Sequence, residues 1–465
     1  MKRVKLFLTA VLTITLAVLA GAVEIKPVKY VFLFIGDGMS LPQRMLAEEY
    51  SRKTANQGLF INSMPFQAVT TTSSASDYIT DSAASGTAIA CGEKTVNRAL
   101  GLDKTLKRKQ QSVAKVAKAA GRKVGIISTM PINHATPAAF CANQPHRKNN
   151  YAIALDLLNT DFDYFGGGGL LNYDDKKHKL YRGDVFTLFA QKGYKVAHNR
   201  RDIEAFEAKS GKFFAAPVKG SYLPFAIDRN ADDMRLEEFV SQAIKLLDNG
   251  KGFFIMAEGG KIDVACHNND GATAAREAVD LDNAVKVALE FARKHPADTL
   301  IVVTGDHETG GLTLGRSGSG YNPDFAKLKL QKYSIDVMVA KVREFLGSRN
   351  DLQFNDIKPL LAEYFNFYFA DSKNIPENAI KLTAAEAEEL QEAFKQQYKD
   401  GKLQRYNPLV WAAIPIFNRK IGVGWTTHSH TALPVITSAY GVNAPLFSGF
   451  IDNTDIAKIL KQAVR

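Results

Sequence analysis

The sequence lacks the features that mark several large classes of protein. It has 3 cysteines in 465 residues, which excludes a disulfide-rich scaffold and leaves at least one thiol free. It contains no Asn-x-Ser/Thr sequon, no block of like charges and no low-complexity segment. Its charged (23%) and hydrophobic (46%) fractions are those of an ordinary globular protein. These observations argue against a fibrous, disordered or repeat protein.

Long hydrophobic runs are also scarce, and the one present lies at the N-terminus. Lys2, Arg3 and Lys5 precede an apolar stretch over residues 6–19, which small residues follow at 20–22. This order is typical of a secretory signal peptide, and the apolar stretch is too short to span a membrane. We therefore predict a signal peptide over residues 1–22, no membrane span after its removal, and a periplasmic or secreted protein of bacterial source. An N-terminal membrane anchor is the alternative.

The chain is basic, with a net charge of +11 that falls to +8 once the three basic residues of the signal peptide are removed. The basic residues are scattered and not interleaved with aromatic residues, so we expect no specific nucleic-acid binding. A mild positive field suits small anionic substrates by steering them. Solubility alone accounts for the charge equally well.

Short apolar runs that end in Gly- or Asp-containing turns alternate with helix-like stretches. This alternation predicts an α/β fold with a doubly wound, mostly parallel central sheet flanked by helices. Sites in such sheets lie beyond the carboxyl ends of the strands. The polar residues at these ends are Asp37, Glu258, Asp263, Asp306 and His307.

Residues 318–420 have few strand signals and show apolar residues at helical spacing, as in Ile335–Phe345. Thr383 and Glu386 form the capping box of a further predicted helix. We expect the aromatic residues around Tyr364 to form the core of this region. The predicted organisation is a signal peptide (1–22), a catalytic domain (23–317 and 421–465) and an inserted, largely helical cap (318–420).

The segment ITDSAASGTA (79–88) offers several hydroxyls and two nearby acids, but no histidine that activates a serine. The Gly-x-Ser-x-Gly pattern of a nucleophile elbow is absent from it. Carboxylates that converge at strand ends raise each other's pKa unless a cation lies between them. Histidine with carboxylate, without a cysteine pair, suits catalytic zinc. These residues predict a metal centre.

Separated segments of the chain resemble, in the same order, the motifs of the alkaline phosphatase family: DSAASGTA, HATPAAF, EGGKIDVACH, DHETGG and GWTTHSHT. The resemblance covers most of the chain after the signal peptide, except the cap. It implies hydrolysis of phosphate monoesters through a phosphoserine intermediate at a site with two Zn²⁺ and one Mg²⁺. It implies that Ser82 is the nucleophile, that Arg147 binds two phosphate oxygens and that Asp81 positions Arg147.

The resemblance also implies a ligand set for each metal. One zinc is expected on Asp263, His267 and His430, the second on Asp37, Asp306 and His307, and magnesium on Asp37, Thr136 and Glu258. His428 competes with His430, but the threonine that follows His430 favours the latter. We interpret the neighbouring Cys266 as a buried or free thiol.

The chain departs from the family pattern at three positions. His134, beside the third metal, stands where many bacterial members carry aspartate, so we expect a weaker magnesium site or another divalent ion. Val264 replaces a residue that usually reaches the phosphate, which predicts weaker phosphate binding. Ala432 replaces a usual glycine.

Other functions stay open at this stage. A sulfatase requires a Cys- or Ser-x-Pro-x-Arg signature, which DSAASGT lacks, and a phosphodiesterase is not expected to keep Arg147. Another phosphoryl-transfer enzyme of the superfamily, such as a metal-dependent mutase, and a non-catalytic phosphate-binding relative are further alternatives. The expected partners are small phosphate monoesters, and a homodimer is an option that the sequence leaves open.

Overall fold

The computed structural model describes residues 24–208, 211–347, 352–399, 402–404 and 407–465. The predicted signal peptide over 1–22 lies outside this part of the chain. Within it, no helix is both long enough and apolar enough to cross a membrane.

A ten-stranded sheet forms the centre, in the order β18-β2-β17-β8-β1-β7-β3-β4-β6-β5. Its pairings are parallel except those of β17, which runs antiparallel to β2 and β8. This arrangement confirms the predicted α/β class with a mostly parallel sheet. The strands are β1 (Tyr30–Gly36), β2 (Phe66–Thr71), β3 (Lys123–Ser128), β4 (Tyr164–Gly167), β5 (Tyr194–Ala197), β6 (Lys212–Ala215), β7 (Phe253–Gly259), β8 (Thr299–Gly305), β17 (Val435–Gly441) and β18 (Gly449–Asp452).

Two hydrophobic cores cover the two faces of this sheet, because successive side chains of a strand point to opposite faces. On β1, Val31, Leu33 and Ile35 enter one core, whereas Phe32 and Phe34 enter the other. The first core is completed by α2 (Ser82–Cys91), α3 (Val113–Ala119), α4 (Ala135–Cys141), α5 (Asn150–Leu158), α6 (Val185–Gln191) and α15 (Asn453–Ala463). The second is completed by α1 (Leu41–Ala55), α7 (Arg200–Glu204), α8 (Leu236–Leu247), α9 (Lys261–His267) and α10 (Gly271–Lys294).

Strand register determines where the functional residues lie. β1 pairs in parallel with β7 and β8, and Gly36 stands opposite both Gly259 and Gly305. All three strands therefore end at the same level of the sheet. As a result, Asp37, Glu258 and Asp306 emerge side by side at its carboxyl edge.

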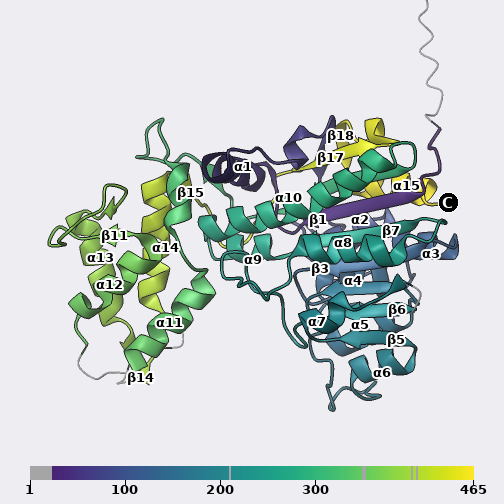
Figure 1. The fold of residues 1–465 in the computed structure, drawn as a ribbon, viewed down its shortest axis with the longest axis horizontal. Coiled ribbons are helices and arrows are strands. Elements are labelled where there is room, and N and C mark those ends of the chain that lie inside the picture. The colour runs from purple at the N-terminus through teal and green to yellow at the C-terminus, as the bar shows by residue number, and fades with distance from the viewer. Residues whose placement is uncertain (1–23, 209–210, 348–351, 400–401, 405–406) are drawn as a thin grey trace, which may run out of the picture.

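Helices α11 (Ile335–Gly347), α12 (Phe354–Phe365), α13 (Ala384–Lys395) and α14 (Pro408–Ile421) gather at one end of the molecule, beside the sheet (Figure 1). They share a third hydrophobic core that includes Tyr364 and Phe365, as expected of the aromatic cluster. The predicted capping box is present: Thr383 Oγ1 accepts from the Glu386 amide at 3.3 Å. The boundaries and the role of the cap stay predictions.

Short strand pairs complete the fold. Two of them lie near the carboxyl edge of the sheet: β9 (Glu308–Thr309) with β16 (His430–Thr431), and β10 (Thr313–Leu314) with β15 (Val423–Gly424). The other two are β11 (Phe367–Tyr368) with β12 (Ile380–Lys381), and β13 (Tyr398–Lys399) with β14 (Lys402–Leu403).

Candidate active site and metal centre

His307 lies at the centre of the cluster beyond the sheet. Its Nε2 is 3.3 Å from Asp37 Oδ1, 3.3 Å from Asp306 Oδ2 and 3.2 Å from Ser82 Oγ. Asp306 is held by its Oδ1, which accepts from the amides of Gly38 and His307 at 3.0 and 2.9 Å. The other carboxylate oxygen of Asp306 is thereby left facing the cluster.

Thr309 fixes the tautomer of His307. Thr309 Oγ1 donates its proton to Asp263 Oδ1 at 2.6 Å. The same oxygen can therefore only accept from His307 Nδ1, which lies 3.3 Å away. The proton of a neutral ring therefore lies on Nδ1, and Nε2 presents its lone pair to two carboxylates. Lone pairs that face one another are unfavourable unless a cation lies between them.

A second group forms around Asp263 on α9. His267, one turn later, places Nε2 3.4 Å from Asp263 Oδ1, and His430 on β16 places Nε2 3.6 Å from the same oxygen. Hydrogen bonds orient both rings: His267 Nδ1 lies 2.6 Å from the His428 carbonyl, and His430 Nδ1 lies 2.9 Å from the Thr80 carbonyl. With Nδ1 as the donor in each ring, Nε2 is free to ligate a metal.

A third group lies on the side of β3 and α4. Glu258 Oε2 accepts a short hydrogen bond from Ser128, and Thr136 Oγ1 lies 3.4 Å from Asp37 Oδ2. His134 Nε2 accepts from Arg147 Nη2 at 3.1 Å, which places the proton of a neutral His134 ring on Nδ1. A protonated nitrogen cannot ligate a metal, so this tautomer makes His134 a neighbour of the third site.

The residues fit bound metal ions. In the described part of the chain, the side-chain atoms of three groups lie within 4.8 Å of one another: Asp263, His307 and His430; Asp37, Asp306 and His307; and Asp37, His134 and Glu258. In the third group the carboxylates are the candidate ligands, because Arg147 occupies the lone pair of His134. Asp37 Oδ1, Glu258 Oε1 and Asp306 Oδ2 are buried without a hydrogen-bond partner. Buried polar atoms are normally satisfied, and a cation is the partner that suits three unpaired carboxylate oxygens.

Electrostatics support the same conclusion. Burial, and then the neighbouring carboxylates, raise the pKa of Asp37 well above its usual value. Burial raises the pKa of Glu258 to about 7 and lowers the pKa of His307 well below its usual value. The pKa of His134 is lowered to about 3 by burial and by Arg147, so that ring is neutral at neutral pH. A bound divalent cation offsets these penalties, because it favours the ionised carboxylates and the neutral imidazoles.

Ser82 begins α2, with its side chain buried next to the cluster. Asp81 is the N-cap, and its Oδ1 accepts from the Ala84 amide at 3.0 Å. The helix N-terminus therefore points at the site, where its amides and dipole favour an anion. Gly86 in the same helix approaches the α4 backbone closely, since an added Cβ would lie 3.4 Å from Thr136 Cα.

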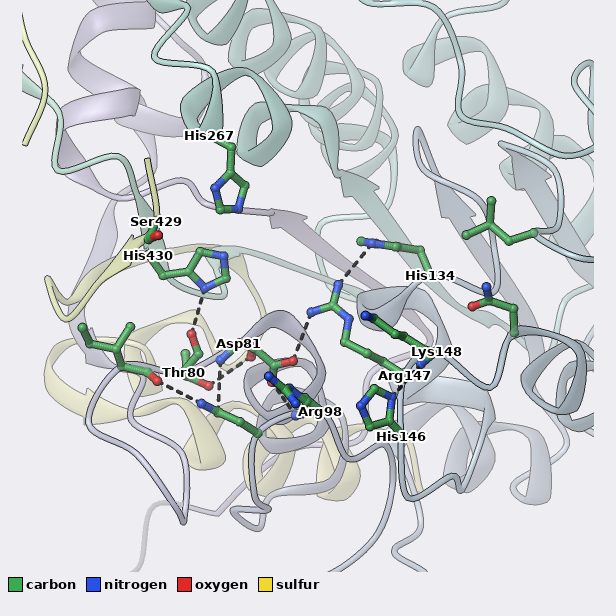
Figure 2. Close-up of a pocket in the computed structure, with 14 residues that line it drawn as sticks. Thr80, Asp81, Arg98, His134, His146, Arg147, Lys148, His267, Ser429 and His430 are labelled. Atoms are coloured by element: carbon green, nitrogen blue, oxygen red, sulfur yellow. Dashed lines mark hydrogen bonds and ion pairs between the residues drawn. The ribbon is translucent and has the colours of Figure 1, made fainter. Parts of the chain in front are cut away.

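Arg147 connects the serine to the third group. Its Nη1 lies 3.1 Å from Asp81 Oδ2 and 3.5 Å from Ser82 Oγ. Figure 2 shows the guanidinium between Asp81 and His134, which its Nη2 reaches. These contacts hold the guanidinium across the mouth of the site, in an orientation that suits two oxygens of a phosphoryl group. The cleft in front of it has a volume of about 800 Å³.

The structure thus brings together Ser82, Asp81, Arg147 and all the predicted metal ligands. His267 and His430 both approach Asp263, and His307 lies close to Asp263 and His430 as well. His428 is directed elsewhere, with its Nδ1 2.9 Å from the His267 carbonyl. Val264 packs against a hydrophobic core. Cys266 is a buried free thiol, as predicted, and Cys91 and Cys141 are free as well.

Sequence reasoning missed the residues that support the ligands. Glu308 accepts from Gln43, Thr431 and the amides of Gly311 and Leu312, and it thereby joins β9 to β16 and α1. Glu308 and Thr309 both lie inside the DHETGG motif, so the signal was present. Ser128 had no signal beyond its position at the end of a strand.

Comparison with known proteins agrees with this geometry. A model of the alkaline phosphatase family matches residues 28–465. Alkaline phosphatase 3 of Bacillus subtilis is 33% identical, over 94% of this chain and 89% of its own length. Alkaline phosphatase of Escherichia coli is 31% identical over 63% of this chain and 72% of its own length. The cold-active alkaline phosphatase structure from Shewanella sp. superposes with a TM-score of 0.78 at 30% identity, covering 94% of this chain and all of that one.

The fold and site define an α/β hydrolase with clusters of candidate metal ligands at the carboxyl edge of a large sheet. The chain belongs to the alkaline phosphatase family, whose members are phosphoric monoester hydrolases.

Proposed function

We propose that this protein hydrolyses phosphate monoesters by transfer of the phosphoryl group to Ser82 and then to water. The observation that carries the proposal is the position of Ser82 Oγ, 3.2 Å from His307 Nε2 and 3.5 Å from Arg147 Nη1. A phosphoryl group at Ser82 has the α2 N-terminus behind it and the guanidinium beside it. In the first step the Ser82 Oγ–P bond forms and the ester P–O bond breaks; water then cleaves the Ser82 Oγ–P bond.

Zn²⁺ is the ion that we propose for the groups containing His307 and Asp263. When bound, zinc supplies Lewis acidity that lowers the pKa of hydroxyl groups and water, which replaces a catalytic base. We propose that Asp263, His267 and His430 hold one ion and that Asp37, Asp306 and His307 hold the other. In the second group, the orphaned oxygens of Asp37 and Asp306 support the assignment.

For the third site we propose Mg²⁺ on Asp37, Thr136 and Glu258, bound weakly or replaced by another divalent ion because His134 is neutral. One solved structure is described as a variant of the TAB5 alkaline phosphatase with histidine replaced by aspartate and with Mg bound in its M3 site. Oxygen ligands suit magnesium, whereas the protonated Nδ1 of His134 adds neither a ligand nor a negative charge.

Arg147 is the residue that we propose for substrate binding, with Asp81 as its positioning partner. Its guanidinium occupies the side of the cleft next to Ser82, where a diester would place its second ester group. This placement favours monoesters over diesters. Export through the predicted signal peptide over 1–22 and assembly as a homodimer stay predictions.

The test is turnover of an aryl phosphate monoester, measured with and without a chelator, alongside metal analysis. We expect about two zinc ions per chain, one for each proposed zinc-ligand group. The chelator should abolish turnover, and added zinc should restore it. A zinc-replete protein that binds inorganic phosphate but releases none from the ester contradicts the proposal and indicates a phosphate-binding protein.

A further inference from the structure

Arg98 has a backbone conformation that few non-glycine residues adopt. Its φ is 74°, in the left-handed region. The conformation is held from both sides: the Arg98 amide donates to Asp81 Oδ1 at 3.0 Å, and its carbonyl accepts from the Arg147 amide at 2.8 Å. Glycine meets this requirement without strain, whereas an arginine at this φ carries a steric cost. Strain of this kind clusters at functional sites.

The charge of the cleft points to a role for the Arg98 side chain. Three cations line it, Arg98, Arg147 and Lys148, against one carboxylate, Asp81, which is already paired with Arg147 at 3.1 Å. Arg98 and Lys148 are exposed. Across the described ranges, neither side chain takes part in an ion pair. Both therefore present uncompensated positive charge to whatever enters the cleft.

Position determines what these two cations meet. Arg147 lies next to Ser82, so the transferred phosphoryl group occupies the inner end of the cleft. Arg98 and Lys148 line the same cleft and are exposed, whereas Arg147 is half-buried. Lys148 follows Arg147 directly, with its amide donating to His146 Nδ1 at 3.1 Å. Figure 2 shows Arg98, Arg147 and Lys148 together around this opening. A leaving group that extends from Ser82 into this cleft comes within reach of their charges.

We propose that Arg98 and Lys148 form a subsite for a second phosphate group carried on the leaving alcohol. The preferred substrates are then small bisphosphorylated molecules, such as sugar bisphosphates, over the corresponding monophosphates. This inference rests on the proposed function, because it assumes a phosphoryl group at Ser82. A phosphate dianion is favoured over a carboxylate because guanidinium and ammonium groups together neutralise two charges.

The test compares kcat/KM for glucose 1,6-bisphosphate and glucose 1-phosphate at low ionic strength. The variants are Arg98→Gly, which keeps the left-handed backbone and removes only the side chain, and Lys148→Ala. Lys251→Ala is the control, since Lys251 is exposed two residues before β7, at the opposite edge of the sheet. We expect the wild-type protein to prefer the bisphosphate and each cleft variant to reduce that preference about threefold, as exposed charge pairs do.

Added salt should reduce the preference in the wild-type protein, because the contacts are exposed and screened. The subsite is refuted if the preference for the bisphosphate is the same in both cleft variants, in Lys251→Ala and in the wild-type protein. Failure of the proposed function looks different: neither the wild-type protein nor any variant then turns over the aryl monoester. Turnover of that ester with an unaltered bisphosphate preference refutes the subsite alone.

Discussion

Thr309 is the residue whose replacement tests the arrangement of the metal centre most sharply. Its hydroxyl donates to Asp263 Oδ1 at 2.6 Å and stands 3.3 Å from His307 Nδ1, so it joins the two groups proposed for zinc. Thr309→Val removes both contacts and leaves the His307 ring free to change its tautomer. We expect this variant to bind zinc more weakly.

The magnitude follows from the hydrogen bond that is lost. A buried hydrogen bond to a charged group contributes about 1.5–3 kcal/mol, which corresponds to about 10- to 100-fold in zinc affinity, the range usual for partners of metal ligands. The assay is competition for zinc with a chromophoric chelator, followed by monoester turnover at saturating zinc. Thr309→Ser should restore the affinity, because serine keeps the hydroxyl.

A matched control separates this effect from loss of a buried hydroxyl in general. Thr70 on β2 is also fully buried, and its Oγ1 lies 2.7 Å from the hydroxyl of Thr437, which is not a proposed metal ligand. Thr70→Val should affect stability without changing zinc affinity. Wild-type zinc affinity in Thr309→Val would refute the reasoning, as would equal weakening in both variants.

Three further predictions follow from the geometry. Asp81→Asn weakens the 3.1 Å ion pair with Arg147, so kcat/KM for an aryl monoester should fall about tenfold, as for a half-buried charge pair, with zinc content kept; an unchanged kcat/KM argues against a positioning role. His134→Asp adds a negative charge at the third site, so titration should show magnesium binding about tenfold tighter; tight stoichiometric binding already present in the wild-type protein contradicts this. Burial raises the pKa of Asp282 to about 6 from 3.8, so the carboxyl group ionises at lower pH in the unfolded state than in the folded state. Between pH 4 and pH 6 the free energy of unfolding should therefore fall by at most about 3 kcal/mol relative to Asp282→Asn. Parallel pH profiles of the two proteins in denaturant unfolding would refute that assignment.

The sequence predicted the sheet and its functional edge well, because the strands concerned are fully buried. The runs that became β1, β7 and β8 are continuous apolar segments, and a polar residue follows or ends each of them. Their alignment follows from parallel pairing. The run that became β17 also indicates a strand, but this strand lies antiparallel to β8. Strand direction depends on the connections and leaves no local signal.

Other features depended on contacts between distant residues. The grouping of His307 with Asp263 and His430 arises where β9 pairs with β16, which brings Thr309 opposite His430. No sequence pattern indicates that two short strands so far apart in the chain pair with each other. The left-handed Arg98 was also missed, since nothing in its neighbourhood signals a positive φ at an arginine.

The helical region also has features that the sequence predicts and features that it does not. The Thr383–Glu386 capping box was predicted correctly because capping is a local interaction within one turn. The position of α11 to α14 at one end of the molecule (Figure 1) depends on the third hydrophobic core, to which Leu46 of α1 and Ala272 and Ala275 of α10 also contribute. Helical periodicity carries no information about such contacts between distant elements.

The central claim is that Ser82 accepts the phosphoryl group, and trapping of the phosphoenzyme tests it most directly. The zinc-loaded protein is incubated with phosphate monoester, quenched in acid and analysed by peptide mass spectrometry. We predict phosphate on the peptide that contains Ser82, and none in Ser82→Ala, whose turnover should fall by about a thousandfold or more, as expected for loss of a nucleophile. Full activity in Ser82→Ala, or phosphate on a different residue, would contradict the account.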